Sequence, residues 1–455
     1  MLTTVTTIYG KITGVSENGC SVFKGVPYAV PPVKDLRFKE PQKPAPFEGV
    51  YAADHFQARC IQSKPEGFYE KEFYHDPAFL PEMSEDCLYL NIWTPAESPE
   101  EKLPVAFWIH GGAYMGGFGS EAEFDGAAFA RKGVILVTIN YRLNIFGFFA
   151  HPWLSAESPN GVSGNYGILD QIAALRWVRE NIAAFGGDPE KVTVFGQSAG
   201  CMSIQTLLSS KLSKGLFRSA ILQSAAGYKR GFCSDKPLSD GEKQGEEFCG
   251  MFGISSLLEL RELPAEKLYE MSGTYNQTLM AKFALEMQEK AAHGEEIDIS
   301  QIPLPSAPLI DGYVMKKGYD AVLEDGDFPD LPYIIGCCKD DLGAGKGDED
   351  NALFKGVQNL AKLVHDQGHQ DAYVYRFDRE MPGDEAGAFH SSELWYVFGS
   401  YKRCWRDLTE ADAGLSERIV SYWTNFVKTG DPNGESLPVW KAFKGTAEEV
   451  LHLNI

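Results

Sequence analysis

The sequence lacks the features that would carry the chain into or across a membrane. No run of apolar residues approaches the length of about 18 that spans a bilayer. The first residues, Met1 to Lys11, have no basic stretch followed by an apolar core, as a secretory signal would. We therefore expect a cytoplasmic protein without a membrane span.

Positive charge is also scarce. The chain has 42 Lys and Arg against 63 Asp and Glu, which gives a net charge of -21. Such a surface repels phosphate backbones and anionic lipids, so we expect no nucleic-acid partner. The surplus of acidic residues is interpreted as a source of solubility.

Patterns for cofactors and metals are missing as well. Neither G-x-x-x-x-G-K-[ST] nor G-x-G-x-x-G occurs after a strand, which argues against a nucleotide site. The nine cysteines include the adjacent pair Cys337 and Cys338, which lacks metal-ligand spacing. His365 and His369 are four residues apart, but Gly368 lies between them and no H-E-x-x-H glutamate follows His365. We expect neither a metal nor an organic cofactor.

What the sequence does contain is a regular alternation of buried strands and helices. An N-terminal hairpin is predicted from 8–13 and 19–24, and long helices from 169–185 and 415–429. This alternation predicts the α/β class, with a large, mostly parallel sheet covered by helices on both faces. Further strands are predicted at 87–93, 104–109, 134–139, 191–195, 219–223, 331–336 and 372–377.

One region departs from the alternation. Between about 231 and 294 the strands disappear and the pattern becomes helical and polar. No linker flanks this region, so we interpret it as a cap-like insertion over the sheet's carboxyl edge. The expected organisation is a single domain over residues 1–455.

The most informative stretch is Gly196-Gln-Ser-Ala-Gly200. It follows the strand 191–195, which is rich in β-branched residues, and precedes a helical segment from about Ser198 to Ser209. G-x-S-x-G between a strand and a helix is the nucleophile-elbow pattern of α/β-hydrolases, in which glycines permit a sharp turn. Ser198 is therefore the candidate nucleophile.

A second glycine-rich loop follows the strand 104–109. His110-Gly-Gly-Ala-Tyr-Met-Gly-Gly117 matches the HGG-type loop that supplies an oxyanion hole in lipases and esterases. An oxyanion hole is a set of N–H donors that stabilises the negative oxygen of an acyl-transfer intermediate.

The other members of a catalytic triad follow from chain order, which in elbow hydrolases is serine, carboxylate, histidine. His293 precedes any plausible acid loop, His365 and His369 precede the last strand, and His452 lies at the very end. His390 comes shortly after the strand that ends at Phe377, so it is the candidate base.

The acid should follow the strand 331–336. Asp340 and Asp341 both lie there, and spacing alone does not choose between them.

Taken together, these motifs resemble the type-B carboxylesterases, the family of cholinesterases, bacterial p-nitrobenzyl esterases and fungal lipases. The resemblance extends over nearly the whole chain and keeps the family's order. It rests on Phe23-Lys-Gly-Val-Pro-Tyr-Ala, Leu36-Arg-Phe, Ser84-Glu-Asp-Cys-Leu-Tyr-Leu-Asn, Trp108-Ile-His-Gly-Gly-Ala, Asn140-Tyr-Arg, Gly164-Asn-Tyr-Gly-Ile-Leu-Asp-Gln, Phe185-Gly-Gly-Asp-Pro, GQSAG and Gly387-Ala-Phe-His.

The resemblance implies roles for individual residues. It makes Ser198 the nucleophile, His390 the base and Asp341 the acid, although relatives usually have glutamate followed by glycine where this chain has Asp341-Leu342. That departure keeps Asp340 as an alternative. It also implies oxyanion donors from the backbone of Gly112, Ala113 and Ala199, and a hydrogen bond from Ser224 to the acid.

Other implications concern the scaffold. Arg37 with Glu85, and Arg142 with Asp170, match structural ion pairs of the family. Cys60 and Cys87 match a disulfide of secreted relatives, which a reducing cytoplasm would leave open.

Two departures bear on the substrate. Asp76-Pro-Ala-Phe-Leu replaces the choline-stacking tryptophan segment, which argues against choline esters. The interval from Asp341 to His390 is shorter than in relatives, so we expect a more open pocket.

The resemblance therefore implies a serine carboxylesterase that acts on a small-molecule ester. The alternatives are a catalytically silent binding or adhesion module, and an esterase whose natural substrate is an aryl or feruloyl ester, a carbamate, an amide or a lipid. Nothing in the sequence sets the oligomeric state. Candidate pocket walls are Tyr114, Met115, Phe118, Phe146, Phe148 and Tyr228.

Overall fold

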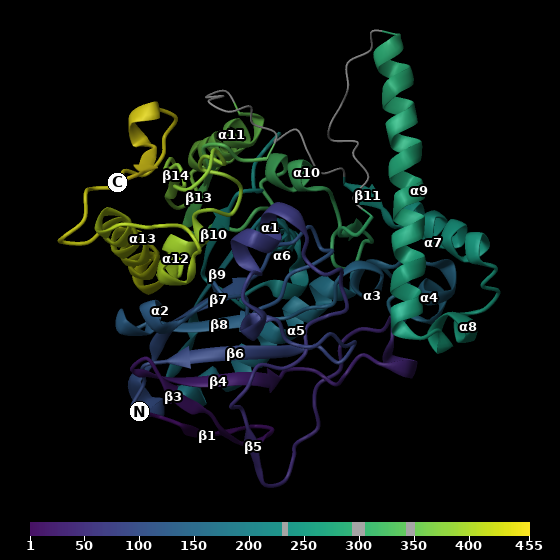
Figure 1. Cartoon of the computed structure of the whole chain (residues 1–455), viewed down its shortest axis with the longest axis horizontal. Helices are drawn as coiled ribbons and strands as arrows, with labels where there is room; N and C mark the ends of the chain where they lie inside the picture. Colours follow the sequence, from purple (N-terminus) through teal and green to yellow (C-terminus); the bar gives the residue numbers. More distant parts are fainter. Residues whose placement is uncertain (230–234, 294–304, 343–350) are drawn as a thin grey trace.

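The computed structural model describes residues 1–229, 235–293, 305–342 and 351–455. Its centre is a ten-stranded sheet in the order β15-β14-β13-β10-β9-β7-β8-β6-β4-β3 (Figure 1). All neighbours from β15 to β8 run parallel, and β6, β4 and β3 continue antiparallel. The strands are β3 (Val15–Glu17), β4 (Cys20–Pro27), β6 (Tyr89–Thr94), β7 (Leu103–Ile109), β8 (Ile135–Ile139), β9 (Gly187–Gln197), β10 (Ser219–Gln223), β13 (Tyr333–Cys338), β14 (Ala372–Phe377) and β15 (Leu451–Leu453). The α/β-hydrolase fold expected from the elbow is thus present.

The central strands are apolar on both faces because each face carries its own core. In β7, Val105 and Phe107 join one hydrophobic cluster, whereas Ala106 and Trp108 join the other. This alternation follows from the two-residue period of a strand. It explains why the central strands have almost continuously hydrophobic sequences.

Helices cover both faces. The first cluster packs under α5 (Tyr166–Asn181), α6 (Ala199–Ser209) and α11 (Ala352–Asp366). The second packs under α2 (Ala127–Arg131), α12 (Leu394–Val397) and α13 (Glu410–Thr429). The remaining elements are β1 (Thr4–Thr7), β2 (Gly10–Thr13), β5 (Val50–Ala52), α1 (Gly67–Phe73), α3 (Asn144–Phe148), α4 (Pro152–Glu157), β11 (Lys236–Pro237), β12 (Leu309–Ile310) and α10 (Tyr319–Glu324), with short 3-10 turns between them.

The predicted N-terminal hairpin was only partly right. The turn at Asn18-Gly19 does close a hairpin, but it joins β3 to β4. The segment 8–13 pairs instead with β1, as the hairpin β1–β2. Gly14, at the junction of the two hairpins, packs so closely that a Cβ there would lie 2.3 Å from the Val22 oxygen.

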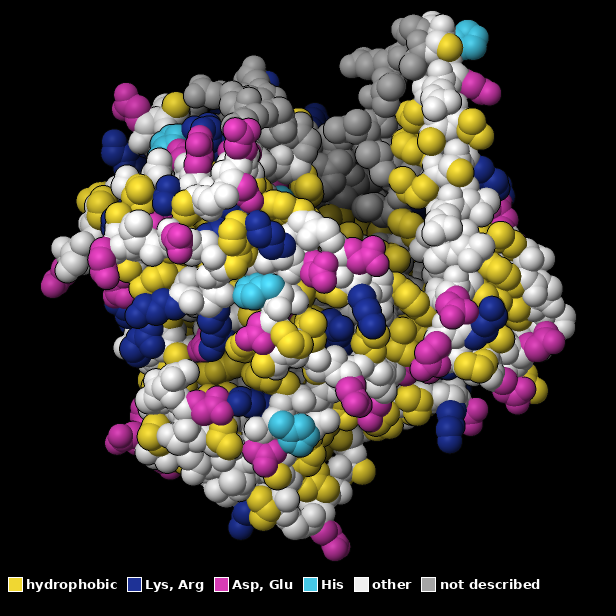
Figure 2. Space-filling view, in the orientation of Figure 1, with side chains coloured by type: hydrophobic (Ala, Val, Ile, Leu, Met, Phe, Trp, Pro, Cys, Tyr) yellow, Lys and Arg dark blue, Asp and Glu magenta, His cyan; other side chains and the backbone are white. Residues whose placement is uncertain are grey.

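Three helices fill the polar region between β10 and β13: α7 (Leu238–Phe252), α8 (Leu257–Glu262) and α9 (Ala265–Ala292). The ends of the predicted insertion, 231–234 and 294, lie outside the described residues. The upper part of α9 stands away from the body and carries apolar side chains such as Met280 and Leu285 (Figures 1 and 2). Among the described helices, none is long and apolar enough to cross a membrane.

Candidate active site

Ser198 lies in a strained turn between β9 and α6. Its φ is 56° and its ψ is -125°, and its side chain is half-buried. The flanking glycines make the turn possible, because a Cβ on Gly196 would lie 2.7 Å from the Ile109 oxygen and one on Gly200 only 2.0 Å from it. No other residue type fits this close crossing of β7. The turn presents Ser198 at the carboxyl edge of the sheet.

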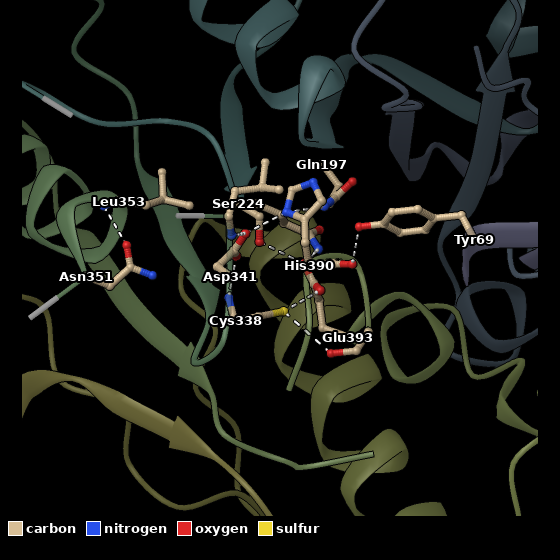
Figure 3. A network of polar contacts seen from close by, with 12 residues as sticks. Tyr69, Gln197, Ser224, Cys338, Asp341, Asn351, Leu353, His390 and Glu393 are labelled. Atoms are coloured by element: carbon tan, nitrogen blue, oxygen red, sulfur yellow. Dashed lines mark hydrogen bonds and ion pairs between the residues drawn. The ribbon is translucent and has the colours of Figure 1, made fainter. Parts of the chain in front are cut away.

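His390 and Asp341 meet at the same edge. Asp341 follows β13, and His390 follows the neighbouring strand β14. Nδ1 of His390 lies 2.6 Å from Oδ1 of Asp341 (Figure 3). The buried carboxylate also accepts the N–H groups of Cys338 and Leu342, each at 2.8 Å. These bonds fix Asp341 and leave Nε2 of His390 as the accepting nitrogen.

Asp340 has a different partner. Its Oδ2 accepts the backbone N–H of Ala388 at 2.8 Å, and a β-bridge joins Asp340 to Phe389. Asp340 therefore connects the two loops, whereas Asp341 contacts the imidazole.

The surroundings of His390 stabilise the protonated form of its imidazole. Burial lowers its pKa, but the charge and the hydrogen bond of Asp341 outweigh burial, so the pKa of His390 is raised above 6.5. This stabilisation of the imidazolium is what a general base in acyl transfer requires.

Gln197, the residue before the candidate nucleophile, also contacts the candidate base. Its Nε2 lies 3.1 Å from Nε2 of His390, and sequence reasoning had assigned it no role. Within the described residues, no hydrogen bond joins the Ser198 hydroxyl to His390. The Gln197 amide thus occupies the lone pair that would accept the serine proton.

The loop after β7, the candidate oxyanion hole, turns through consecutive residues with positive φ. Gly112 has φ +100°, and a Cβ there would lie 2.1 Å from the Gly116 oxygen. Ala113 follows with φ 54°. In the part of the chain that the structure describes, the N–H groups of Gly112 and Ala113 donate to no acceptor. Ala199 opens α6, where the helix dipole favours negative charge.

Two polar side chains hold the C-terminal end of this loop by hydrogen bonds to its backbone. Gln62 Oε1 accepts the N–H of Gly117, and Glu121 Oε1 accepts that of Phe118, both at 2.8 Å. Glu121 contacts a second buried acid, Glu123. Burial raises the pKa of Glu121 to about 7, and burial with the charge of Glu121 raises the pKa of Glu123 well above its usual value.

Ser224 has a partner other than the one expected. Its hydroxyl donates to Oε1 of Glu393 at 3.3 Å, and its described hydrogen bonds do not include Asp341. Glu393 also accepts the Cys338 thiol at 2.8 Å. Burial, reinforced by the charge of Asp341, raises the pKa of Glu393. Sequence reasoning assigned Glu393 no role. The available signal was an acidic residue three positions after His390 and directly before an apolar run.

Most of the candidate pocket walls belong to the core. Tyr114, Phe118, Phe146 and Phe148 are buried. Tyr114 packs on Phe148 at 4.8 Å between ring centres, and Phe118 on Tyr74 at 6.1 Å. Met115 and Tyr228 are partly exposed. The glycine-rich loop after β7 thus rests on an aromatic layer, and among the candidate pocket walls only Met115 and Tyr228 are partly exposed.

The expected ion pairs are present. Arg37 binds Glu85 and the buried Arg142 binds Asp170, at 2.6 and 2.7 Å.

Cys60 and Cys87 are buried free thiols.

Between Asp341 and His390 the described residues form one helix, α11, and one strand, β14. No group of three or more His, Cys, Asp or Glu side chains in the described residues is arranged to hold a metal ion.

Comparison with known proteins identifies the family. The model of the carboxylesterase family matches residues 2–352 and 349–455. The chain is 36% identical to the para-nitrobenzyl esterase of Bacillus subtilis over 489 residues, covering 99% of this chain and 94% of that protein. It is 32% identical to liver carboxylesterase 1 of Oryctolagus cuniculus, covering 96% of this chain and 87% of the relative. A solved thermophilic PNB esterase superposes with a TM-score of 0.82 at 32% identity, covering 100% of this chain and 96% of that one.

Proposed function

Because this chain belongs to the carboxylesterase family, we propose that Ser198, His390 and Asp341 carry out its chemistry as nucleophile, general base and acid. The protein is a carboxylic ester hydrolase of the α/β-hydrolase fold. The observation that carries the assignment is the 2.6 Å bond between His390 and Asp341, on loops that follow neighbouring strands beside the elbow of Ser198.

The first half of the reaction forms an acyl-enzyme. His390 Nε2 takes the proton of Ser198 as the oxygen attacks the ester carbonyl. The N–H groups of Gly112, Ala113 and Ala199 bind the resulting oxyanion. His390 then gives its proton to the leaving alcohol, while Asp341 stabilises the imidazolium.

The second half regenerates the enzyme. Water replaces the alcohol, gives its proton to His390 and attacks the acyl group on Ser198. The second tetrahedral intermediate collapses to the free acid, and Ser198 recovers its proton. For Ser198 to reach Nε2, the Gln197 amide must leave that nitrogen.

A catalytically silent binding module is the alternative. Such a module needs no working nucleophile. This chain, in contrast, has the serine, the histidine and the carboxylate at the carboxyl edge of the central sheet. No observation specific to this structure favours the silent module.

We further propose that the chain is a single domain in which α7, α8 and α9 form the cap-like insertion.

The substrate of the protein is a small-molecule ester. The net charge of the chain, -21, argues against a nucleic-acid partner. The free thiols of Cys60 and Cys87 support a reducing compartment, the cytoplasm.

Labelling with a fluorophosphonate tests the assignment directly. The wild type should label once and lose activity, and Ser198→Ala should neither label nor turn over p-nitrophenyl acetate. The control Ser203→Ala, on α6 but away from the turn, should label normally. A folded wild-type protein that never labels would contradict the proposal.

A further inference from the structure

A hollow that is open to solvent lies between α2, α13 and the segment 398–403, which follows α12. Its volume is about 1120 Å³. The described residues that line it include none of the proposed catalytic or oxyanion groups. The hollow is therefore separate from the active site, and ester hydrolysis gives it no task.

Positive charge gathers at this hollow. Figure 2 shows Lys and Arg side chains where α2 and α13 approach each other. Arg131, at the end of α2, and Lys402, in the 3-10 turn Tyr401–Arg403, both line the hollow, and both are exposed. In the part of the chain that the structure describes, neither side chain donates a hydrogen bond or pairs with an acid. On a chain with 63 acidic and 42 basic side chains, two cations without acidic partners form a local positive site.

The acids that line the hollow have partners of their own. Among the described residues these acids are Asp125 and Glu417. Asp125 forms an ion pair with Arg403, and Glu417 forms one with Lys132. The negative charges of the wall are thus balanced locally, and the charges of the two unpaired cations remain for a ligand.

Hydrogen bonds hold the wall of the hollow in place. The Ser400 hydroxyl donates to the backbone oxygen of Glu123 at 2.7 Å, and the Arg403 guanidinium donates to that of Ala122 at 2.8 Å. The segment 398–403 is therefore fixed to the segment 121–125. A wall that is fixed before a ligand arrives reduces the entropy cost of binding.

The arrangement of the two cations selects the charge of the ligand. Arg131 and Lys402 come from different elements, so a ligand that contacts both presents more than one anionic group. A guanidinium binds phosphate oxygens through two parallel hydrogen bonds, and an ammonium binds them as a point charge. A compact ligand senses this local field, whereas a long polyanion or an anionic membrane meets the net charge of -21.

We propose that this hollow binds a soluble small molecule with two or more phosphate groups, and that Arg131 and Lys402 are its principal contacts. The inference does not depend on the roles of Ser198 and His390. It adds a second ligand site to the protein, remote from the ester.

Isothermal titration calorimetry with sodium tripolyphosphate, in magnesium-free buffer, tests the site. The wild type should bind one tripolyphosphate per chain. Arg131→Gln/Lys402→Gln should weaken binding at least about tenfold, because charge-assisted hydrogen bonds are lost. Lys402→Arg keeps the charge and should keep the affinity within about threefold.

The matched control removes the same charge elsewhere. Lys211 and Lys214 are two exposed cations close together in sequence, and neither lines the hollow. Lys211→Gln/Lys214→Gln should bind tripolyphosphate as the wild type does. Melting temperatures without ligand should be equal in both double variants, since all four side chains are exposed.

Several results would overturn the inference. No binding to the wild type at about 1 mM tripolyphosphate would do so. Equal weakening in both double variants would show an effect of net charge alone. Citrate that binds as tightly as tripolyphosphate would reject the phosphate class, and binding to phosphoinositide vesicles without competition by tripolyphosphate would assign the site to a lipid.

Fluorophosphonate separates this site from the active site. Protein labelled with fluorophosphonate should bind tripolyphosphate with the affinity of the unlabelled protein, and so should Ser198→Ala. Loss of binding after labelling would place the anion in the active site and overturn the inference. A wild type that binds tripolyphosphate but never labels would contradict the proposed function alone.

Discussion

Nδ1 of His390 lies 2.6 Å from Oδ1 of Asp341, whereas the adjacent Asp340 accepts the backbone N–H of Ala388. Two neighbouring carboxylates thus have separate tasks, one at the base and one between two loops. Asp341 contacts the imidazole, whereas the Asp340 carboxylate is engaged by the backbone of the loop that carries His390.

This difference predicts unequal effects of removing each charge. Asp341→Asn should lower kcat by about 10,000-fold, because the imidazole loses its correct tautomer and its counter-charge. Asp340→Asn keeps a carbonyl oxygen for Ala388 and should cost at most about fivefold, since one hydrogen bond contributes about 1 kcal/mol. Steady-state kinetics on p-nitrophenyl acetate, with melting temperatures for both variants, measure this. A larger loss in Asp340→Asn would reverse the assignment.

The raised pKa of His390 predicts the acid limb of the pH profile. Only neutral imidazole accepts the Ser198 proton, so kcat/KM should rise with pH through an inflection above 6.5. Removing the Asp341 charge takes away the main contribution that raises this pKa, so the inflection should move to lower pH. NMR titration of His390 in Ser198→Ala and Ser198→Ala/Asp341→Asn gives both values, and His390→Gln identifies the signal. A titration of the Asp341-containing protein at or below 6.5 would be inconsistent with this account.

Much of the scaffold could be predicted because its signals are local. The strand before Ser198 is marked by the apolar residues Val192, Val194 and Phe195. The glycines at 196 and 200 indicate the close crossing of β7. Chain order then located His390. Such features depend on residue type and spacing, which a sequence displays directly.

The partners of polar side chains could not be predicted in the same way. Gln197 and His390 are 193 positions apart, and Tyr69 and His390 are separated by 321. Ser224 was assigned to the acid by resemblance, yet it donates to Glu393. These contacts depend on how separate loops meet at the sheet edge, which no local pattern records.

Gln197 predicts how the base would respond to a charge beside it. Gln197→Glu places a carboxylate within reach of Nε2 of His390, now 3.1 Å from the amide nitrogen. An opposite charge at this range raises a pKa by about 1 to 3 units. The inflection in kcat/KM should move up accordingly, while the uncharged control Gln197→Leu should move it less. Identical inflections in the wild type and Gln197→Glu would show that this side chain does not face the base.

The buried acids Glu121 and Glu123 predict a pH-dependent stability. Burial raises the pKa of Glu121 to about 7, and burial together with the charge of Glu121 raises that of Glu123 well above its usual value. Their contribution is therefore fully present below about pH 4.5, the unfolded value, and is lost as pH rises through about 7.

Glu123→Gln removes the repulsion between the two acids. The free energy of unfolding at pH 8 should rise by about 1 to 3 kcal/mol relative to the wild type, and its dependence on pH between 5 and 8 should flatten. Urea unfolding at both pH values measures the change. Glu48→Gln, at an exposed carboxylate, should leave the slope as it is. A steeper slope in Glu123→Gln would contradict the raised pKa values of the two acids.

The loop at Gly112 offers the sharpest test of the oxyanion hole, because two of its glycines differ in the room around them. A Cβ on Gly112 would lie 2.1 Å from the Gly116 oxygen at a φ of +100°, so Gly112→Ala has to move the loop and its free N–H groups. A Cβ on Gly116 would meet only Gln62 Oε1, at 3.2 Å. Losing one oxyanion donor lowers kcat by about 100- to 1000-fold, and Gly112→Ala should approach this loss. Gly116→Ala, the matched control in the same loop, should lose much less. If Gly112→Ala folds and turns over p-nitrophenyl acetate at the wild-type rate, the oxyanion must be bound elsewhere, since no backbone that keeps these donors in place leaves space for that methyl group.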